Sequence, residues 1–142
     1  MLSKTRKTPT SRLRGHSRGQ TGVEFAGTAL LLFMAIFGIF CASMLLYAYN
    51  FVSNSARDAV RYAIVHGSHS LDPATSSDIT TYVKDMASGL QSNNISVTTT
   101  WNPDNNPGSV VSVQVTYDFQ PFFPFSSTAL PLTSTSQMVI SN

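Results

Sequence analysis

Cysteine and charge are both scarce in this sequence, and each scarcity limits what the chain can be. Cys41 is the only cysteine, so no disulfide can form within the chain and any folded domain must be held together by packing. No charged residue lies between Glu24 and Arg57, and no acidic residue precedes Glu24. The chain therefore consists of a basic head, a long uncharged stretch and a remainder that contains most of the acids.

The basic head has three common explanations. A segment of this kind acts as a nucleic-acid-binding arm, as a targeting segment or as a flank that orients a membrane span. The uncharged stretch that follows it favours the membrane roles, so we do not expect nucleic acid as a partner. Six of the nine Lys and Arg residues lie in this head: Lys4, Arg6, Lys7, Arg12, Arg14 and Arg18.

Residues 25–49 (FAGTALLLFMAIFGIFCASMLLYAY) predict a transmembrane helix in contact with membrane lipid. As a helix this segment would be about 37 Å long, enough to cross a hydrocarbon core of about 30 Å. It is also longer than the roughly 7–15 apolar residues of a cleavable secretory signal. Because the basic residues precede the span, we expect a cytoplasmic N-terminus and an exported C-terminal domain.

The helix is expected to continue beyond the span to about residue 66. Apolar and small residues recur there at a spacing of three to four, which is typical of one face of a helix. Asp58 and Arg61 are three residues apart, which is near enough for their side chains to interact on a helix. Gly67 is expected to end the helix as its C′ residue, with His66 in the last turn near the negative helix end.

The remainder of the chain predicts a second helix and three strands. Thr75 and Asp78 have the spacing of a capping box, and apolar residues follow them at helical period as far as Leu90. Apolar residues then alternate with polar ones from Ile95, and again from Val111 to Phe119, with a turn-forming segment between the two runs. A third strand is predicted from Leu132 to Ile140.

These elements predict an α+β fold: a long N-terminal transmembrane helix that extends into a small exported domain with one short helix and a three-stranded antiparallel sheet. The expected divisions are a basic leader at 1–19, the transmembrane and extended helix at 20–66 and the exported domain at 67–142.

The sequence contains no arrangement of residues typical of catalysis. His66 and His69 lie at the expected helix end, and the sequence places no third metal ligand near them. Asp104, Asn105 and Asn106 lack the alternating oxygen ligands and the terminal glutamate of a calcium loop, so they predict a turn. We therefore expect no enzyme, no bound metal or cofactor and no small-molecule substrate.

Residues 18–25 (RGQTGVEF) join the basic head to the apolar segment. Glu24 follows Gly19 by five positions, and Phe25 opens the apolar segment. This arrangement resembles the processing signal of type IV prepilins, which a membrane prepilin peptidase cuts after the glycine. The resemblance implies cleavage between Gly19 and Gln20.

Each residue of this junction has a physical reason. Glycine puts no side chain between the chain and a protease. A carboxylate at the membrane boundary is costly unless it is paired with a cation. In pilin-like assemblies that cation is the N-terminal amine of a neighbouring subunit, so the resemblance implies that Glu24, followed by Phe25, sets the register of assembly.

A second resemblance concerns the longer pattern GQTGVEFAGTALLLF, followed about thirty residues later by NSARDAVRYA. The combination resembles the TadE-like family, the pseudopilins of the bacterial tight-adherence (Tad, or Flp pilus) machinery. The matching residues are Val23, Glu24, Phe25 and Ala26, and then Ala56, Arg57, Asp58, Arg61, Tyr62 and Ala63.

This resemblance implies a minor, non-catalytic component of the bacterial inner membrane that assists pilus assembly or secretion. Its implied partners are the prepilin peptidase and other pilin-like or Tad assembly proteins.

An alternative function depends on the C-terminal half. Phe122, Phe123 and Phe125 lie between prolines in the segment that joins the last two predicted strands. These rings either cover the edge of a small core or form an exposed apolar surface that binds a partner or the membrane. In the alternative, the chain is an uncleaved single-pass envelope protein whose exported domain binds a cell-envelope partner.

Overall fold

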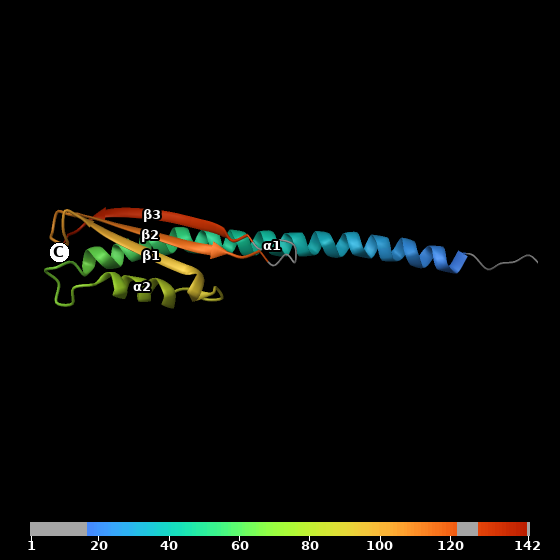
Figure 1. Cartoon of the computed structure of the whole chain (residues 1–142), viewed down its shortest axis with the longest axis horizontal. Helices are drawn as coiled ribbons and strands as arrows, with labels where there is room; N and C mark the ends of the chain where they lie inside the picture. The colour runs from blue at the N-terminus through green and yellow to red at the C-terminus, as the bar shows by residue number, and fades with distance from the viewer. Residues whose placement is uncertain (1–16, 122–127, 142) are drawn as a thin grey trace, which may run out of the picture. The chain divides into compact units, whose positions relative to one another are not determined.

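The computed structural model describes residues 17–121 and 128–141, and it has the predicted α+β fold (Figure 1). Contacts divide the chain into two compact units, an N-terminal unit at residues 1–38 and a C-terminal unit at residues 39–142. The elements are α1 (Ser17–Val65), α2 (Ser76–Asp85), the short 3₁₀ helix η1 (Ser92–Asn94), β1 (Ile95–Asn102), β2 (Val110–Phe119) and β3 (Leu130–Val139).

The C-terminal end of α1 differs from its prediction in the role of Gly67. The helix ends at Val65, and Gly67 does not adopt the left-handed conformation expected of a C′ glycine. The carbonyl of Tyr62 accepts hydrogen bonds from both the backbone N–H and the Nδ1 of His66, at 3.1 and 2.9 Å. The carbonyl of His66 accepts one from the N–H of Ala74 at 2.9 Å. These bonds satisfy carbonyls at the helix end, so no left-handed residue is required.

The capping box of α2 is confirmed. The Thr75 hydroxyl accepts a hydrogen bond from the Asp78 N–H at 3.4 Å, and the Asp78 carboxylate accepts one from the Thr75 N–H at 2.8 Å. The helix ends at Asp85, so it does not reach Leu90 as the apolar period predicts. Gly89, with a φ of 76°, lies in the turn that follows and adopts a conformation that residues with a Cβ rarely take.

The sheet is an antiparallel meander of strand order β1-β2-β3, as predicted. The central strand β2 alternates as its sequence predicts, with one row of side chains buried and the other row facing outward. β3 begins at Leu130, two residues before its predicted start, and it includes Pro131. Proline is tolerated there because β3 is an edge strand. The buried row of β2 is Val111, Val113, Val115 and Tyr117.

The core of the C-terminal unit lies between the helices and the sheet. Four alanines of α1 are at most 2% exposed, and they pack in one cluster with α2 and β2. Small side chains at these positions allow the helix and the sheet to approach closely. The four alanines are Ala48, Ala56, Ala59 and Ala63.

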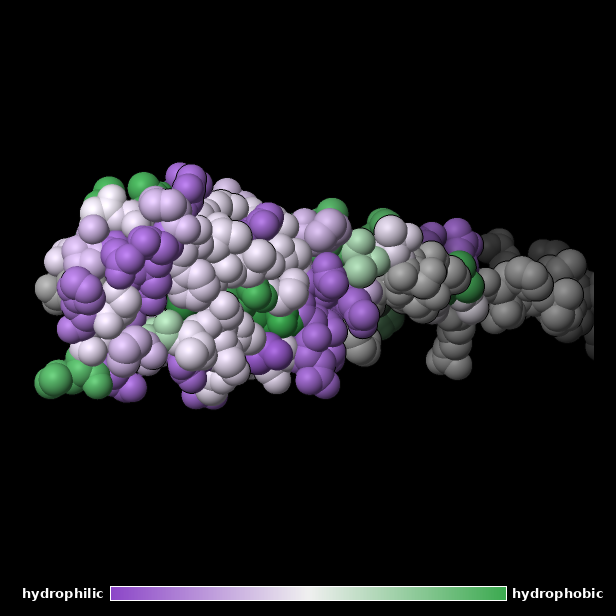
Figure 2. Space-filling view, turned by 60° about the vertical axis from the view of Figure 1, so that its left-hand side comes forward, coloured by the Kyte–Doolittle hydropathy of each residue, from purple (hydrophilic) through white to green (hydrophobic). Residues whose placement is uncertain are grey.

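The face that Figure 2 shows is covered mainly by hydrophilic and weakly polar side chains.

Candidate functional site

The junction residues Gly19, Gln20, Glu24 and Phe25 all lie near the start of α1. The Glu24 carboxylate is exposed and accepts one long hydrogen bond, from Gln20 Nε2 to its Oε1 at 3.4 Å. The Thr28 hydroxyl donates to the backbone carbonyl of Glu24 at 3.0 Å and leaves the carboxylate untouched. No ion pair with Glu24 is formed within the part of the chain that the structure describes.

The Gly19–Gln20 peptide bond lies in the first turn of α1, whereas a protease needs its substrate extended. The first N–H groups of a helix have no intrahelical partner, and helix ends fray readily. The geometry therefore allows local unwinding at this bond. The cleavage itself stays a prediction.

Apolar side chains of the N-terminal unit are exposed to their surroundings. Phe25, Leu31 and Phe33 are 75, 70 and 68% exposed. The helix Gly19–Val65 is long and apolar enough to cross a membrane by length and composition, and its most apolar window is not buried. These features indicate a single-pass, membrane-anchored protein.

The family element at residues 56–63 divides into a buried and an exposed face of α1. Arg57 and Arg61 are exposed and lie four residues apart on one side of the helix, and Asp58 is half-buried. Asp58 and Arg61 are near enough in sequence to interact, but no ion pair joins them in the described part of the chain. Exposed ion pairs gain little in water, so the spacing alone does not bring the two side chains together.

Tyr62 of the same element is held in an aromatic stack that the sequence analysis missed. Its ring stacks on that of His66, with centroids 4.1 Å apart, and on that of Tyr82 in α2, with centroids 4.6 Å apart. Stacked aromatic pairs of this kind stabilise a fold by about 0.5–1.5 kcal/mol beyond the area that they bury. Tyr62 therefore joins α1 to α2. Only the helical spacing of Tyr62 and His66 was visible in the sequence.

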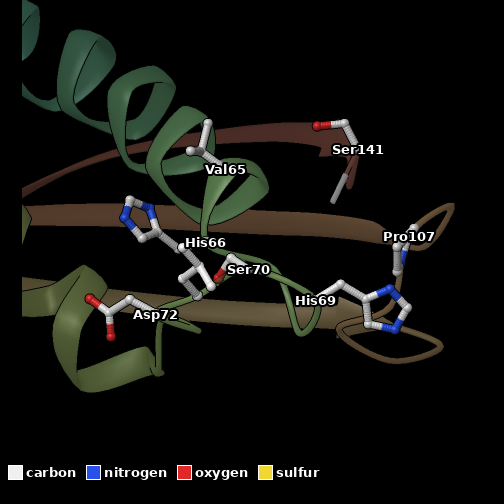
Figure 3. Close-up of a pocket in the computed structure, with 8 residues that line it drawn as sticks. Val65, His66, His69, Ser70, Asp72, Pro107 and Ser141 are labelled. Carbon is white, nitrogen blue, oxygen red and sulfur yellow. The ribbon is translucent and has the colours of Figure 1, made fainter.

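An open cavity of about 590 Å³ lies at the end of α1 and includes His66, His69 and Asp72 in its lining. His66 uses its Nδ1 on the Tyr62 carbonyl, as described above. Figure 3 shows His69 pointing toward Pro107 and away from His66. The two imidazoles do not converge, and no group of three metal-ligating side chains occurs among residues 17–121 and 128–141.

Asp104 organises the turn between β1 and β2. Its Oδ1 accepts hydrogen bonds from Ser109 Oγ at 2.6 Å and from the Asn106 N–H at 3.0 Å, and its Oδ2 accepts one from Asn106 Nδ2 at 2.6 Å. The Ser109 hydroxyl, followed by the N–H and amide groups of Asn106, holds the pKa of Asp104 below its ordinary value of 3.8. The segment is thus the turn that its sequence predicts, with the carboxylate satisfied by its own loop.

The turn makes the stability of the C-terminal unit sensitive to acid. Because the pKa of Asp104 is lower in the folded chain than in the unfolded chain, its stabilising effect is fully present above the ordinary value and is lost as the pH falls through the folded value. We expect the melting temperature to fall below about pH 4, and to fall less in Asp104→Asn. Thermal unfolding of the detergent-solubilised full chain, followed by the fluorescence of Trp101, measures this.

The matched control for this prediction is Asp85→Asn, which removes an exposed carboxylate at the end of α2. It should leave the acid-induced loss as large as in the parent protein. Equal acid sensitivity in Asp104→Asn and the parent would show that the turn carboxylate has no such role.

The remaining predicted site residues, Phe122, Phe123 and Phe125, lie outside the described residues, so their predicted surface stays a prediction.

Comparison with known proteins finds a similarity in the N-terminal part of the chain. The family model described as TadE-like protein matches residues 19–61, from the junction glycine to the second arginine of the exposed pair. No curated protein and no solved structure matches the chain. The matched segment contains Glu24, the exposed apolar helix and both Arg57 and Arg61, so the predicted resemblance to the TadE-like family is confirmed over residues 19–61.

Proposed function

We propose that this protein is a non-catalytic pseudopilin of TadE type, a minor component that assists assembly of the Tad (Flp) pilus or secretion by its machinery. The observation that carries the proposal is the match of residues 19–61 to the TadE-like family, over a helix whose apolar segment begins directly after the carboxylate of Glu24. In this proposal the N-terminus is cytoplasmic, the C-terminal unit lies outside the inner membrane, and a prepilin peptidase removes residues 1–19.

Glu24 is the residue that sets the register of assembly in this proposal. Its carboxylate is exposed and accepts one long hydrogen bond, at 3.4 Å, from the uncharged amide of Gln20, which leaves the negative charge unpaired. A carboxylate beside hydrocarbon gains from a cation that comes to it, and the new N-terminal amine of a neighbouring processed subunit is such a cation. The pairing fixes the axial displacement between the helices of two neighbouring subunits.

Arg57 and Arg61 are the side chains that we assign to partner contact in the C-terminal unit. Both are exposed on α1, and neither forms an ion pair within residues 17–121 or 128–141. Two like charges one turn apart attract an acidic or polar surface and add little to the fold itself. Tyr62, by contrast, is used in the stack with Tyr82 and has a structural role.

Replacement of Glu24 by glutamine tests the proposal. The substitution keeps the size of the side chain and removes its charge, so the pairing with an amine loses at least about 1.5 kcal/mol, and assembly should fall about tenfold or more. Pili are counted on cells of a Tad-positive host in which the variant replaces the parent protein. The membrane level of the variant, measured by immunoblot, should be unchanged.

A matched double variant, Gln20→Glu with Glu24→Gln, moves the carboxylate one helical turn while keeping the net charge. We expect it to stay defective even where intact mass spectrometry shows that residues 1–19 have been removed, because the acid is displaced by about 6 Å along the helix. Normal piliation in Glu24→Gln, or full restoration by the displaced acid, would remove Glu24 from the mechanism.

A further inference from the structure

The C-terminal unit covers part of the apolar segment that was predicted to lie in the membrane. Ala48 is fully buried, Cys41 and Leu45 are half-buried, and the Tyr47 hydroxyl donates a hydrogen bond to the carbonyl of Ser88 at 2.7 Å. The last two turns of the segment 25–49 therefore pack against protein on one side. A span that continued to Tyr49 would place this packed region inside the hydrocarbon.

A shorter span agrees better with both the packing and the membrane thickness. A helix needs about 20 apolar residues to cross the hydrocarbon core, and 20 residues counted from Phe25 end at Met44. The uncovered side of the following turns is still apolar, with Leu46 61% and Tyr49 56% exposed. Aromatic residues such as Tyr47 and Tyr49 are typical of the membrane–water interface.

A cavity of about 210 Å³ lies at this same level of α1. One wall consists of Phe40, Cys41 and Met44, which belong to the apolar segment, and the other includes Leu90 and Phe119 from the loop after α2 and the end of β2. None of the described residues that line it is charged. Most of the lining residues are apolar, with Gln91 and Gln120 as polar exceptions, and the α1 wall of the recess belongs to the end of the shorter membrane span.

We propose that this recess holds part of an acyl chain of a membrane phospholipid, so that the loop after α2 and the end of β2 reach into the outer edge of the hydrocarbon. The continuity of the Phe40–Met44 wall with the span favours lipid as the occupant, because the uncovered apolar faces on both sides of the recess need a nonpolar medium. The inference rests on the membrane anchoring in the proposed function. It adds the level of the C-terminal unit relative to the membrane and its contact with lipid.

Quenching of tryptophan fluorescence by brominated lipid tests this inference. The full-length protein is reconstituted in phosphatidylcholine–phosphatidylglycerol vesicles whose acyl chains are brominated. Phe119→Trp and Phe33→Trp are each combined with Trp101→Phe, so that each variant contains a single tryptophan at the position under test. The parent protein, whose single tryptophan is Trp101, gives the fluorescence of that position. Trp101 pairs with Val111, eight residues along β2 from Phe119 and so about 26 Å away. Its Nε1 has no hydrogen-bond partner, so Trp101→Phe leaves no group unpaired.

We expect Phe119→Trp and Phe33→Trp to lose most of their fluorescence in brominated vesicles, and Trp101 to lose almost none. Quenching at position 33 without quenching at position 119 would overturn the lipid-filled recess while leaving the membrane anchor intact. Absence of quenching at position 33 would instead contradict the anchor itself. Protection of position 119 that disappears when the protein is diluted in lipid would assign the recess to a second copy of the chain and overturn the proposal.

Discussion

Replacing Gly19 by valine is expected to leave residues 1–19 attached to the chain in a host that contains a prepilin peptidase. A Cβ at position 19 would have open space around it, so we expect the substitution to disturb little of the packing. Its effect therefore falls on the protease, which needs a chain without a branched side chain beside the bond to be cut. Intact mass spectrometry of protein purified from membranes distinguishes the cut chain from the uncut chain in each variant.

Gly22→Val is the matched control for this experiment. Gly22 also lies on α1 with open space around it, three residues after Gly19. We expect complete processing in the parent and in Gly22→Val, and almost none in Gly19→Val. A parent chain that still begins at Met1 would favour the alternative, an uncleaved single-pass envelope protein that binds a partner through its C-terminal unit.

The second large effect is expected from Val113→Asp, at the centre of the sheet. Val113 is 0% exposed in the middle strand, and its neighbours in the cluster are apolar. A carboxylate there would have no partner and no water, which costs more than about 4 kcal/mol. Small domains are stable by about 5–15 kcal/mol, so most or all of the stability of the C-terminal unit should be lost. The near-ultraviolet circular dichroism of Trp101 in detergent reports the loss.

Gln114→Asp is the matched control, because it introduces the same residue one position further along the same strand. Gln114 is exposed on the opposite face of β2. We expect a change within about 0.5 kcal/mol, as is usual for surface substitutions. Equal destabilisation by the two variants would mean that the buried face of β2 is assigned wrongly.

The parts of the fold that follow from local patterns could be predicted from the sequence. The alternation in β2 is strict because one face of the strand is buried against the helices, so pattern and burial agree residue by residue. The capping box of Thr75 and Asp78 was visible for the same reason, since both partners lie within four residues. The junction motif and the family element were visible as local strings of sequence.

The features that depend on distant residues could not be predicted. Nothing local connects Tyr62 with Tyr82, or Tyr47 with Ser88, because these contacts form only when α2 and its loop pack on α1. Hydropathy does not distinguish an apolar residue that faces lipid from one that faces a sheet. It therefore could not show that the C-terminal unit covers Ala48.

The topology of the chain tests the central claim most directly, because anchoring by α1 with the C-terminal unit outside underlies every proposal above. Cys41→Ser removes the only cysteine, and Ser77→Cys then places a single thiol on an exposed position of α2. A membrane-impermeant maleimide added to intact spheroplasts should label this thiol as completely as it does after lysis. Labelling only after lysis would place the C-terminal unit in the cytoplasm and contradict the account.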